Sequence, residues 1–389
     1  MKLPLIRNYN FSTFKKTNMK YYIIAGEASG DLHGSNLMKA LYVEDPEAEI
    51  RFWGGDLMQK VGGTLVKHYR ELAFMGFIEV VFNLKTILNN IKICKKDISE
   101  FKPDVIIFID YPGFNMRIAK WAKELGYKTH YYISPQIWAW KENRINAIKQ
   151  DVDKMFVILP FEKSFYEDKH HFPVDFVGHP LIDAIQNQPA FDEALFRKEN
   201  NLGEKPIISV LPGSRKQEIT KMLSVMLSVV DDFQDYEFVI AGAPSQEYEF
   251  YQQFLKNKNI AFVSNKTYDL LRSSTAALVT SGTATLETAL FKVPEVVCYK
   301  GSEVSYQIAK RIITLKYISL VNLIMDQEVV TELIQGECNK KRIKEELQKL
   351  LEPEYRKKVL HNYDILEQKL GGIGASKKTA ELIVADLKK

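Results

Sequence analysis

The stretch PIISVLPGSRKQEI, residues 206–219, decides how we expect the chain to fold. Residues 207–211 predict a buried strand, and the Pro-Gly pair that follows predicts a tight loop before a helix. Such a loop offers backbone N–H groups and the positive end of the helix dipole to an anion. Gly213 and Ser214 form the loop, and Arg215 adds a planar cation that suits a phosphate. A strand-to-helix turn of this kind also occurs as plain architecture, so the rest of the chain has to decide.

A similar strand–loop–helix unit opens the chain. Residues 21–25 predict a short strand, and GEASGDLHG at 26–34 leads into a helix. The carboxylates of Glu27 and Asp31 would repel a phosphate, so we expect this loop to hydrogen-bond sugar hydroxyls. Alternatively, Asp31 or Ser29 caps the helix. Two such units, with strands and helices alternating between them, predict an α/β protein with two Rossmann-like domains facing a cleft.

The composition is that of a soluble globular protein of two domains. The chain has 389 residues, 46% of them apolar and 26% charged, which is enough for two cores. A net charge of +4 is too small for the basic stripe of a nucleic-acid-binding protein. A polar connection around residues 181–205 separates an N-terminal domain, 19–185, from a C-terminal domain, 186–376, and the last helix, 377–389, could return to the first domain.

Several classes of protein are excluded. The three cysteines form no CxxC pair and no HExxH occurs, so we expect no disulfide framework, no metal site and no cofactor, in a reducing cytoplasm. The sequence contains no run of about 18 uncharged apolar residues, so we expect no transmembrane helix. The first 18 residues lack the apolar core of a signal peptide, and we expect them to be a disordered or non-native extension before Met19.

The clearest strand of the first half is PDVIIFID, residues 103–110. Its apolar run suits a central parallel strand that is buried on both faces. In such sheets the carboxyl ends of the strands face the ligand, so Asp110 is a candidate general base. The alternative is a turn or cap aspartate, although Asn115 is better placed as the cap. Further on, Trp138 and Trp140 follow another strand and could line a sugar or acyl site, or cover the sheet.

Residues 74–91 carry more apolar side chains than one helix face needs. The stripe at helical spacing would pack on the sheet and comprises Phe77, Val80, Val81, Leu84, Ile87, Leu88 and Ile91. Four apolar residues lie outside it: Phe74, Met75, Ile78 and Phe82. Lysines follow, so this surplus is typical of a helix that docks on a membrane surface. A thicker core or a dimer contact would explain it equally well.

The second domain holds another polar loop at a strand end. SGTATLETAL at 281–290 places Ser281, Gly282 and Thr283 at a helix N-terminus, where they would meet a phosphate. Glu287 lies one turn further on the same face and can accept both hydroxyls of a ribose, although it could instead lie on a solvated face. We expect residues 317–324, YISLVNLI, to be extended, with Asn322 either partnered internally or facing the cleft.

With these motifs in view, the chain resembles the lipid-A-disaccharide synthases, membrane-associated glycosyltransferases of the GT-B fold. The segments that carry the resemblance are AGEASGD at 25–31, ELAFMGFIEV at 71–80, IDYPGFN at 109–115, SPQIWAW at 134–140, LPFEKSFY at 159–166, FVGHPLID at 176–183, LPGSR at 211–215, SGTATLE at 281–287 and YISLVNLI at 317–324. Val321 departs from the family pattern, which has a proline there.

The resemblance implies an inverting transfer of sugar from UDP-2,3-diacylglucosamine to 2,3-diacylglucosamine 1-phosphate, on the inner face of the inner membrane. It implies Asp110 as the base and Arg215 at the donor phosphates. The implied donor site comprises Gly213, Ser214, Arg215, Ser281, Gly282, Thr283, Glu287 and Asn322, and the implied acceptor site comprises Glu27, Ser29, Asp31 and Asn115.

Two alternatives remain at this point. One is a sugar-nucleotide enzyme of the same fold, such as a UDP-N-acetylglucosamine 2-epimerase, which needs no acyl pocket. The other is a non-catalytic nucleotide- or lipid-binding protein, which has no use for a carboxylate at Asp110. A homodimer through the C-terminal segment is a further expectation.

Overall fold

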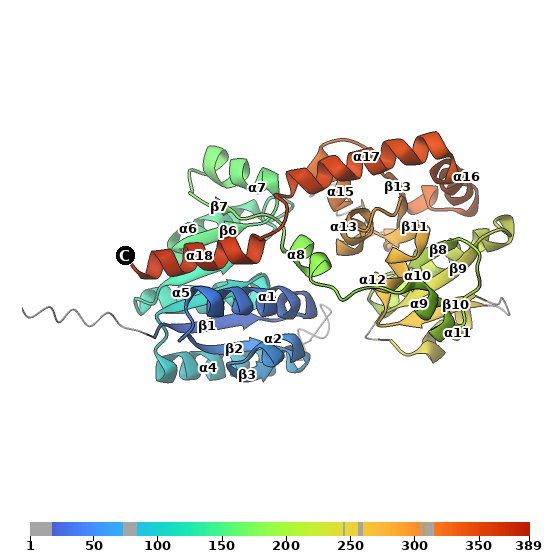
Figure 1. The fold of residues 1–389 in the computed structure, drawn as a ribbon. Helices are drawn as coiled ribbons and strands as arrows, with labels where there is room; N and C mark the ends of the chain where they lie inside the picture. Colours follow the sequence, from blue (N-terminus) through green and yellow to red (C-terminus); the bar gives the residue numbers. More distant parts are fainter. Residues whose placement is uncertain (1–17, 73–83, 244–245, 256–259, 304–305, 308–314) are drawn as a thin grey trace, which may run out of the picture.

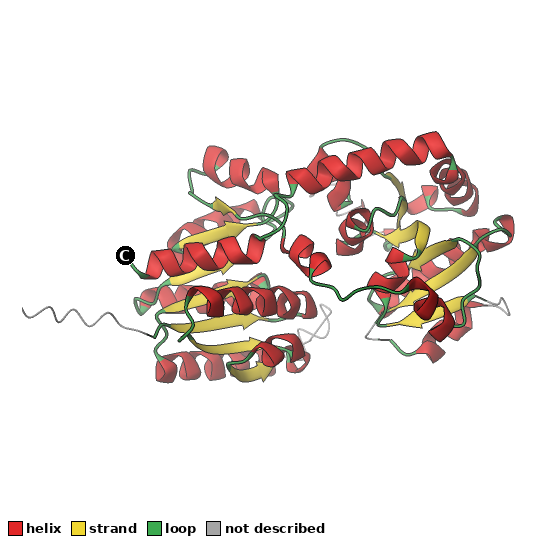
Figure 2. Ribbon diagram, viewed as in Figure 1, coloured by secondary structure: helices red, strands yellow, loops and turns green. Residues whose placement is uncertain are grey.

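The chain forms two lobes, each a parallel sheet covered by helices (Figures 1 and 2). The computed structural model describes residues 18–72, 84–243, 246–255, 260–303, 306–307 and 315–389. Both sheets are buried between helices, which explains why their central strands are continuous apolar runs. The predicted α/β class with two Rossmann-like sheets is confirmed.

The N-terminal sheet has seven strands in the order β3-β2-β1-β4-β5-β6-β7. All neighbouring strands pair in parallel. The strand order reverses between β1 and β4, and ligands bind at such switch points, outside the carboxyl ends of the strands. The strands are β1 (Lys20–Ala25), β2 (Glu49–Gly54), β3 (Thr64–His68), β4 (Val105–Ile109), β5 (Thr129–Tyr132), β6 (Lys154–Val157) and β7 (Asp175–Phe176).

Helices follow almost every strand of this lobe, as in other doubly wound folds. They are α1 (Ala28–Glu44), α2 (Asp56–Val61), η1 (Tyr69–Glu71), α4 (Leu84–Phe101), α5 (Pro112–Glu124), η2 (Glu142–Arg144), α6 (Ile145–Asp151), α7 (Pro160–Ser164), the π-helical turn η3 (Phe165–Lys169) and α8 (Pro180–Gln186).

Helix α4 corrects part of the predicted apolar stripe. It packs on the sheet through the buried side chains of Asn90, Cys94 and Ile98, four residues apart. Leu88, which we placed in the buried stripe, is 48% exposed. The buried face of α4 therefore runs through Asn90, Cys94 and Ile98 and not through Leu88. One of these residues is a polar asparagine, which a search for apolar side chains at helical spacing does not find.

The C-terminal sheet repeats the same design with six strands in the order β10-β9-β8-β11-β12-β13, again all parallel. Here the order reverses between β8 and β11, so the loops after these two strands lie at the ligand-binding edge. The strands are β8 (Ile207–Leu211), β9 (Glu237–Gly242), β10 (Ala261–Ser264), β11 (Ser274–Thr280), β12 (Glu295–Tyr299) and β13 (Thr331–Ile334).

One segment of this lobe differs from our expectation. Residues 317–324 are not extended, because the side chain of Ser319 accepts a hydrogen bond from the Asn322 N–H and caps a helix that starts at Leu320. The helices are α9 (Glu193–Glu199), α10 (Lys216–Met226), η4 (Leu227–Asp232), α11 (Tyr248–Leu255), α12 (Thr267–Arg272), α13 (Thr283–Leu290), α15 (Leu320–Met325), η5 (Gln335–Glu337), α16 (Lys340–Leu351) and α17 (Pro353–Lys369).

The chain crosses between the lobes twice, and the two crossings touch. Helix α17 ends on the C-terminal lobe, and α18 (Ala375–Leu387) packs on α1 and α8 of the N-terminal lobe (Figure 1). The N–H of His179 donates to the carbonyl of Leu370 at 2.9 Å. The carboxylate of Asp183 accepts the N–H groups of Gly374 at 2.7 Å and Ser376 at 2.8 Å, so it caps α18.

At its far end α18 is held by charge. The carboxylate of Asp386 lies 2.9 Å from Nζ of Lys128 and 3.1 Å from Nε2 of His130, a histidine buried in β5. Hydrogen bonds from His130 and Lys128 hold the pKa of Asp386 well below its usual range. The last helix is thus fixed to the first lobe at both ends.

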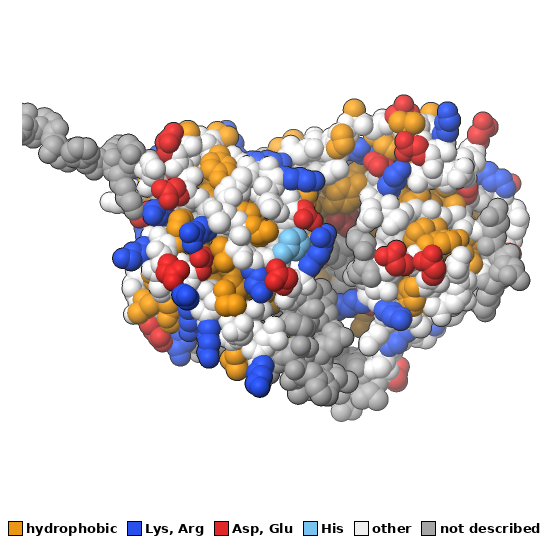
Figure 3. All heavy atoms as spheres, turned by 90° about the horizontal axis from the view of Figure 1, so that it is seen from below, with side chains coloured by type: hydrophobic (Ala, Val, Ile, Leu, Met, Phe, Trp, Pro, Cys, Tyr) orange, Lys and Arg blue, Asp and Glu red, His pale blue; other side chains and the backbone are white. Residues whose placement is uncertain are grey.

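The two lobes flank a hollow on the face shown in Figure 3. The first crossing begins after Gly178 with α8, which packs on α1 and α18, and continues through residues 187–192 to α9, which packs on α12. Within the described residues, no helix combines the length and the apolar character that crossing a bilayer requires.

Replacing the cap of α18 tests the crossing. We expect Asp183→Ala to lower the free energy of unfolding by about 2–4 kcal/mol, because two N–H groups lose a largely buried carboxylate. The matched control is Asp192→Ala, which removes an exposed cap of α9 and should cost about 1 kcal/mol. Urea denaturation measures both values. Equal losses in the two variants would contradict a special role for Asp183.

Candidate active site

The carboxyl ends of β1 and β4 carry an unusual turn at Asp110. Asp110 has a φ of 44° and Tyr111 a φ of 50°, both in the left-handed region that is costly for residues with a side chain. Three hydrogen bonds hold this backbone in place. The Asp110 carbonyl accepts the hydroxyl of Tyr131 at 2.6 Å and Nδ2 of Asn115 at 2.7 Å, and the Asp110 N–H donates to the carbonyl of Tyr132 at 3.2 Å.

The strained turn presents a carboxylate with a shifted pKa. Burial, aided by the negative charge of Glu27, raises the pKa of Asp110 to about 6, although the N–H of Tyr111 opposes the shift. Such a group is ionised at neutral pH and can accept a proton more readily than an ordinary aspartate. Shifted carboxyl groups at a ligand-binding edge are typical of catalytic sites.

The loop after β1 brings Glu27 to this carboxylate. A Cβ atom on Gly26 would lie 2.3 Å from Cδ1 of Tyr111, so only glycine allows the two loops to meet this closely. Glu27 and Ser29 are exposed at the start of α1. Glu27 occupies the N-cap position of α1, but its side chain makes no capping hydrogen bond. Ser29 lies inside the helix, so neither side chain caps it.

Two other residues predicted at the acceptor site have structural partners. Asp31 is buried and accepts the N–H groups of Gly55, Leu57 and Met58, at 2.8, 3.0 and 3.0 Å. It therefore caps α2, a helix that follows a different strand, and the expectation that it caps its own helix is wrong. Asn115 is completely buried, and its Nδ2 reaches the carbonyls of Ile24 and Ile109 as well as that of Asp110.

The loop after β8 is the predicted anion site of the second lobe. Gly213 has a φ of 109°, and the N–H groups of Ser214 and Arg215 both donate to Oε2 of Glu218, at 3.2 Å each. The loop thus holds an oxyanion, supplied here by the helix that it precedes. The guanidinium of Arg215 is 67% exposed, with Nη1 3.6 Å from Oε1 of Glu218.

The loop after β11 lies beside it in the sheet. Gly282 and Thr283 are exposed at the start of α13, and Oγ of Ser281 donates to the carbonyl of Ile318 at 2.9 Å. Glu287 is not on a freely solvated face, because its Oε1 accepts the hydroxyl of Tyr268 at 2.8 Å. Burial raises the pKa of Glu287.

Asn322 is fully enclosed and all four of its hydrogen-bonding positions are taken. Its Nδ2 donates to the Val330 carbonyl at 2.8 Å and to Oε1 of Glu332 at 2.9 Å. Its Oδ1 accepts the N–H groups of Val329 at 2.7 Å and Val330 at 3.0 Å. The amide has no capacity left for a ligand, so this residue ties α15 to β13.

Similarity to known proteins agrees with this geometry. A model of the family described as lipid-A-disaccharide synthetase matches residues 21–384. A lipid-A-disaccharide synthase of Syntrophus aciditrophicus is 38% identical over 377 residues, which cover 94% of this chain and 97% of the relative. One from Coxiella burnetii is 35% identical over 373 residues, which cover 94% and 98%.

The chain belongs to the lipid-A-disaccharide synthase family. The predicted family and the prediction of a glycosyltransferase are confirmed.

Solved structures share the fold of this synthase family member at low identity. A UDP-N-acetylglucosamine 2-epimerase from Neisseria meningitidis, bound to UDP-GlcNAc, has a TM-score of 0.64 at 14% identity and covers 94% of this chain and 100% of its own. The glycosyltransferase SnogD from Streptomyces nogalater has a TM-score of 0.55 at 16% identity and covers 95% and 99%. These likenesses bear out the GT-B fold.

Sequence analysis missed one residue that supports this synthase site. Glu162 is buried and accepts hydrogen bonds from Oγ of Ser134 at 2.6 Å and Nε1 of Trp138 at 3.1 Å. It also accepts the N–H groups of Ile158 and Leu159, at 3.1 and 2.8 Å. A proline followed two residues later by glutamate is typical of a helix start, so the sequence could have predicted that Glu162 caps this helix. Nothing in the local sequence predicts its hydrogen bonds to Ser134 and Trp138.

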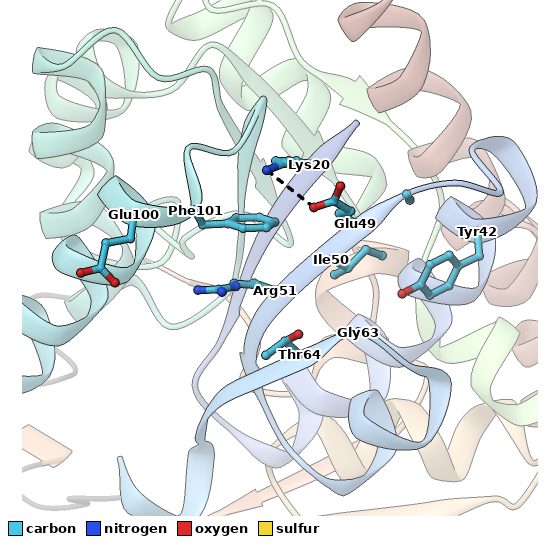
Figure 4. Close-up of a pocket in the computed structure, with 10 residues that line it drawn as sticks. Lys20, Tyr42, Glu49, Ile50, Arg51, Gly63, Thr64, Glu100 and Phe101 are labelled. Atoms are coloured by element: carbon cyan, nitrogen blue, oxygen red, sulfur yellow. Dashed lines mark ion pairs between the residues drawn. The ribbon is translucent and has the colours of Figure 1, made fainter. Parts of the chain in front are cut away.

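A pocket of about 450 Å³ lies away from this site (Figure 4). It opens at the first residues of β1 and β2, at the opposite end of these strands from Asp110. Its cations already have partners, since Lys20 lies 3.6 Å from Glu49 and Arg51 lies 2.6 Å from Asp97. We therefore assign it no ligand.

The proposed membrane-docking residues remain untested. Phe74, Met75, Ile78 and Phe82 lie outside the described residues, so the surplus of apolar side chains around them stays a sequence-based prediction.

Proposed function

We propose that the chain transfers 2,3-diacylglucosamine from UDP to the C6 hydroxyl of 2,3-diacylglucosamine 1-phosphate. The products are UDP and a β(1→6)-linked disaccharide 1-phosphate. Membership of the lipid-A-disaccharide synthase family supports this substrate pair. The observation that carries the chemistry is Asp110, a carboxyl with its pKa raised to about 6 on a strained turn at the switch point of the N-terminal sheet.

On the acceptor side, Asp110 takes the proton of the attacking hydroxyl as the new bond forms. A sugar hydroxyl is a poor nucleophile, and a positioned base contributes roughly 10²- to 10⁴-fold to the rate. Glu27 keeps the affinity of Asp110 for a proton high, and Ser29, two residues after Glu27, is exposed and can meet a sugar hydroxyl. Asp31 and Asn115 act indirectly, because their polar groups hold the loops that carry these side chains.

On the donor side, the loops after β8 and β11 hold the nucleotide. Gly213, Ser214 and Arg215 bind the diphosphate through the N–H groups that donate to the Glu218 carboxylate, which the diphosphate replaces. Arg215 stabilises the negative charge that develops on departing UDP. The N-terminus of α13 lies on the neighbouring loop, with Ser281, Gly282 and Thr283.

Glu287 completes this donor site as the ligand of the ribose. Its carboxylate is already fixed by Tyr268 in one orientation, which suits the binding of a diol.

We assign the acceptor to residues 19–185 together with α18 and the donor to residues 186–376. Because both sugars carry acyl chains, we further propose that the protein lies peripherally on the cytoplasmic face of the inner membrane. Docking through Phe74, Met75, Ile78 and Phe82 and assembly as a homodimer are parts of this proposal that rest on the sequence alone.

Release of UDP tests the reaction. Purified protein in detergent should release UDP from UDP-2,3-diacylglucosamine only when 2,3-diacylglucosamine 1-phosphate is also present. A coupled assay for UDP measures the rate, and plain UDP-N-acetylglucosamine is the control. Conversion of the control into its 2-epimer, which releases no UDP and is followed by proton NMR, would contradict the proposal and favour the epimerase alternative, which the fold alone also permits.

The pH profile tests the base. Asp110 must be ionised to accept a proton, so kcat should rise with pH through about 6 and then level off. In Glu27→Gln the neighbouring negative charge is lost, the pKa of Asp110 falls, and the rising limb should move to lower pH. Asp110→Asn should reduce kcat by roughly 10²- to 10⁴-fold above about pH 7, where Asp110 of the wild type is ionised, and should abolish the rising limb. A rising limb that stays in place in Glu27→Gln would contradict the assigned pair.

Replacement of Arg215 tests the donor site. Arg215→Ala should lower kcat by about 10²- to 10³-fold even with saturating acceptor, because UDP departs without its cation. Its guanidinium is exposed, so the free energy of unfolding should stay unchanged. Steady-state kinetics and urea denaturation measure the two quantities, and an unchanged kcat would remove Arg215 from the site.

A further inference from the structure

The loop after β5 starts beside the proposed base. Tyr132, the last residue of β5, pairs with Ile109 in the sheet, and its carbonyl accepts the N–H of Asp110. The loop then runs through residues 133–141 to the short helix η2. Whatever its side chains bind will therefore lie at the same sheet edge as Asp110.

This loop is rigidly built. Glu162 fixes it through Ser134 and Trp138, and the carbonyl of Pro135 accepts the hydroxyl of buried Tyr166 at 3.2 Å. Ile137 is buried in the core of the lobe. The loop ends in Lys141, which has a left-handed φ of 59°. Strained backbone that the surroundings fix in place is common where a protein prepares a binding site.

Two cations, which have no acidic partner within the described part of the chain, flank an exposed tryptophan on this loop. Trp140 is 49% exposed, with Nζ of Lys141 4.1 Å and Cζ of Arg144 5.8 Å from the centre of its ring. The intervening Glu142 pairs instead with Lys169 at 2.6 Å and His170 at 3.0 Å. Among the described residues, no carboxylate lies within 4.0 Å of Lys141 or Arg144.

The positive charge of Arg144 acts on Tyr131, a residue of β5 that contacts the Asp110 turn. Burial and the charge of Asp110 raise the pKa of Tyr131, and the positive charge of Arg144 opposes this rise. Tyr131 is the residue that donates to the carbonyl of Asp110. Helix α6 (Ile145–Asp151), which begins right after Arg144, also packs on α5, the helix that follows the Asp110 turn.

We propose that Lys141 and Arg144 form the subsite for the phosphate of the acceptor sugar, with the indole of Trp140 against the apolar face of the sugar ring. This inference rests on the proposed function, which supplies an acceptor with a phosphate. Lys141 is a mobile point charge and Arg144 a planar fork, and together they match a phosphate dianion. Tryptophan offers a flat apolar surface at low entropic cost.

The geometry favours the acceptor phosphate over the phosphates of a bilayer. The acceptor carries its phosphate on C1 and reacts at the C6 hydroxyl, and the carbons that bear these two groups, C1 and C5, flank the ring oxygen of one sugar ring. Its phosphate must then bind at the edge that holds Asp110, but on a neighbouring loop, which is where Lys141 and Arg144 lie. A bilayer needs no rigid loop and no proximity to the base, because its headgroups attract any exposed cations.

Direct binding tests the subsite without turnover. Titration calorimetry with short-chain 2,3-diacylglucosamine 1-phosphate, in the absence of donor, gives the Kd of the acceptor. We expect Lys141→Ala and Arg144→Ala each to weaken binding about 10-fold, whereas Lys149→Ala, an exposed lysine in α6, should leave the Kd unchanged. The same acceptor without its phosphate should bind all four proteins, wild type included, with one weak affinity.

Three results would overturn the inference. One is an unchanged Kd in both variants. Another is an equal loss for the acceptors with and without phosphate, which would show damage to the fold of the loop. The third is that Lys141→Ala and Arg144→Ala sediment less with anionic vesicles than the wild type does while their acceptor Kd is unchanged. That result would assign the two cations to the membrane surface. If the wild type binds the acceptor in a phosphate-dependent way but releases no UDP, the transferase proposal fails and the subsite stands.

Discussion

The contact between the two crossings of the chain is the constraint on which the paired lobes depend. The first crossing leaves the N-terminal lobe after Gly178, and the second returns at Leu370 and Gly371. A Cβ on Gly371 would lie 3.1 Å from Cα of Gly178, so the two backbones meet through glycines. Asp183 then caps the returning helix, which links the helix to the first lobe with two charge-assisted hydrogen bonds.

Neutral histidines beside this contact keep it free of unpaired positive charge. Burial, together with the charge of His33, lowers the pKa of His179 to about 3, and burial lowers that of His33 to about 4. Nδ1 of His179 accepts the N–H of Leu181, which requires the unprotonated ring. Folded protein therefore binds fewer protons than unfolded protein between about pH 4 and 6.5, and stability at the crossing decreases as the pH falls through this range.

Sequence patterns predicted the sheets well and the roles of polar residues less well. Strands such as 105–109 and 207–211 are buried on both faces, so local composition alone identifies them. Asp31 and Asn322 are polar residues inside binding-type motifs, yet their partners Gly55 and Glu332 lie 24 and 10 residues away, just before α2 and on β13. No local pattern records which distant N–H group or carboxylate will face such a side chain, so a structural cap and a ligand-binding group look alike in sequence.

The number of N–H donors around each carboxylate separates these roles. Asp31, Asp183 and Glu162 each accept two or more backbone N–H groups, which fixes the position of the carboxylate. Glu218 also accepts two N–H groups, at the β8 loop, but in a half-exposed position, which is the place that the proposed function assigns to the diphosphate.

Asp110 is different, because its backbone carbonyl and N–H take the supporting bonds while its carboxyl is left beside Glu27 with a raised pKa. A carboxyl whose backbone is restrained and whose side-chain charge is destabilised takes up a proton more readily than an ordinary aspartate, and this combination is what supports our proposal of Asp110 as the base.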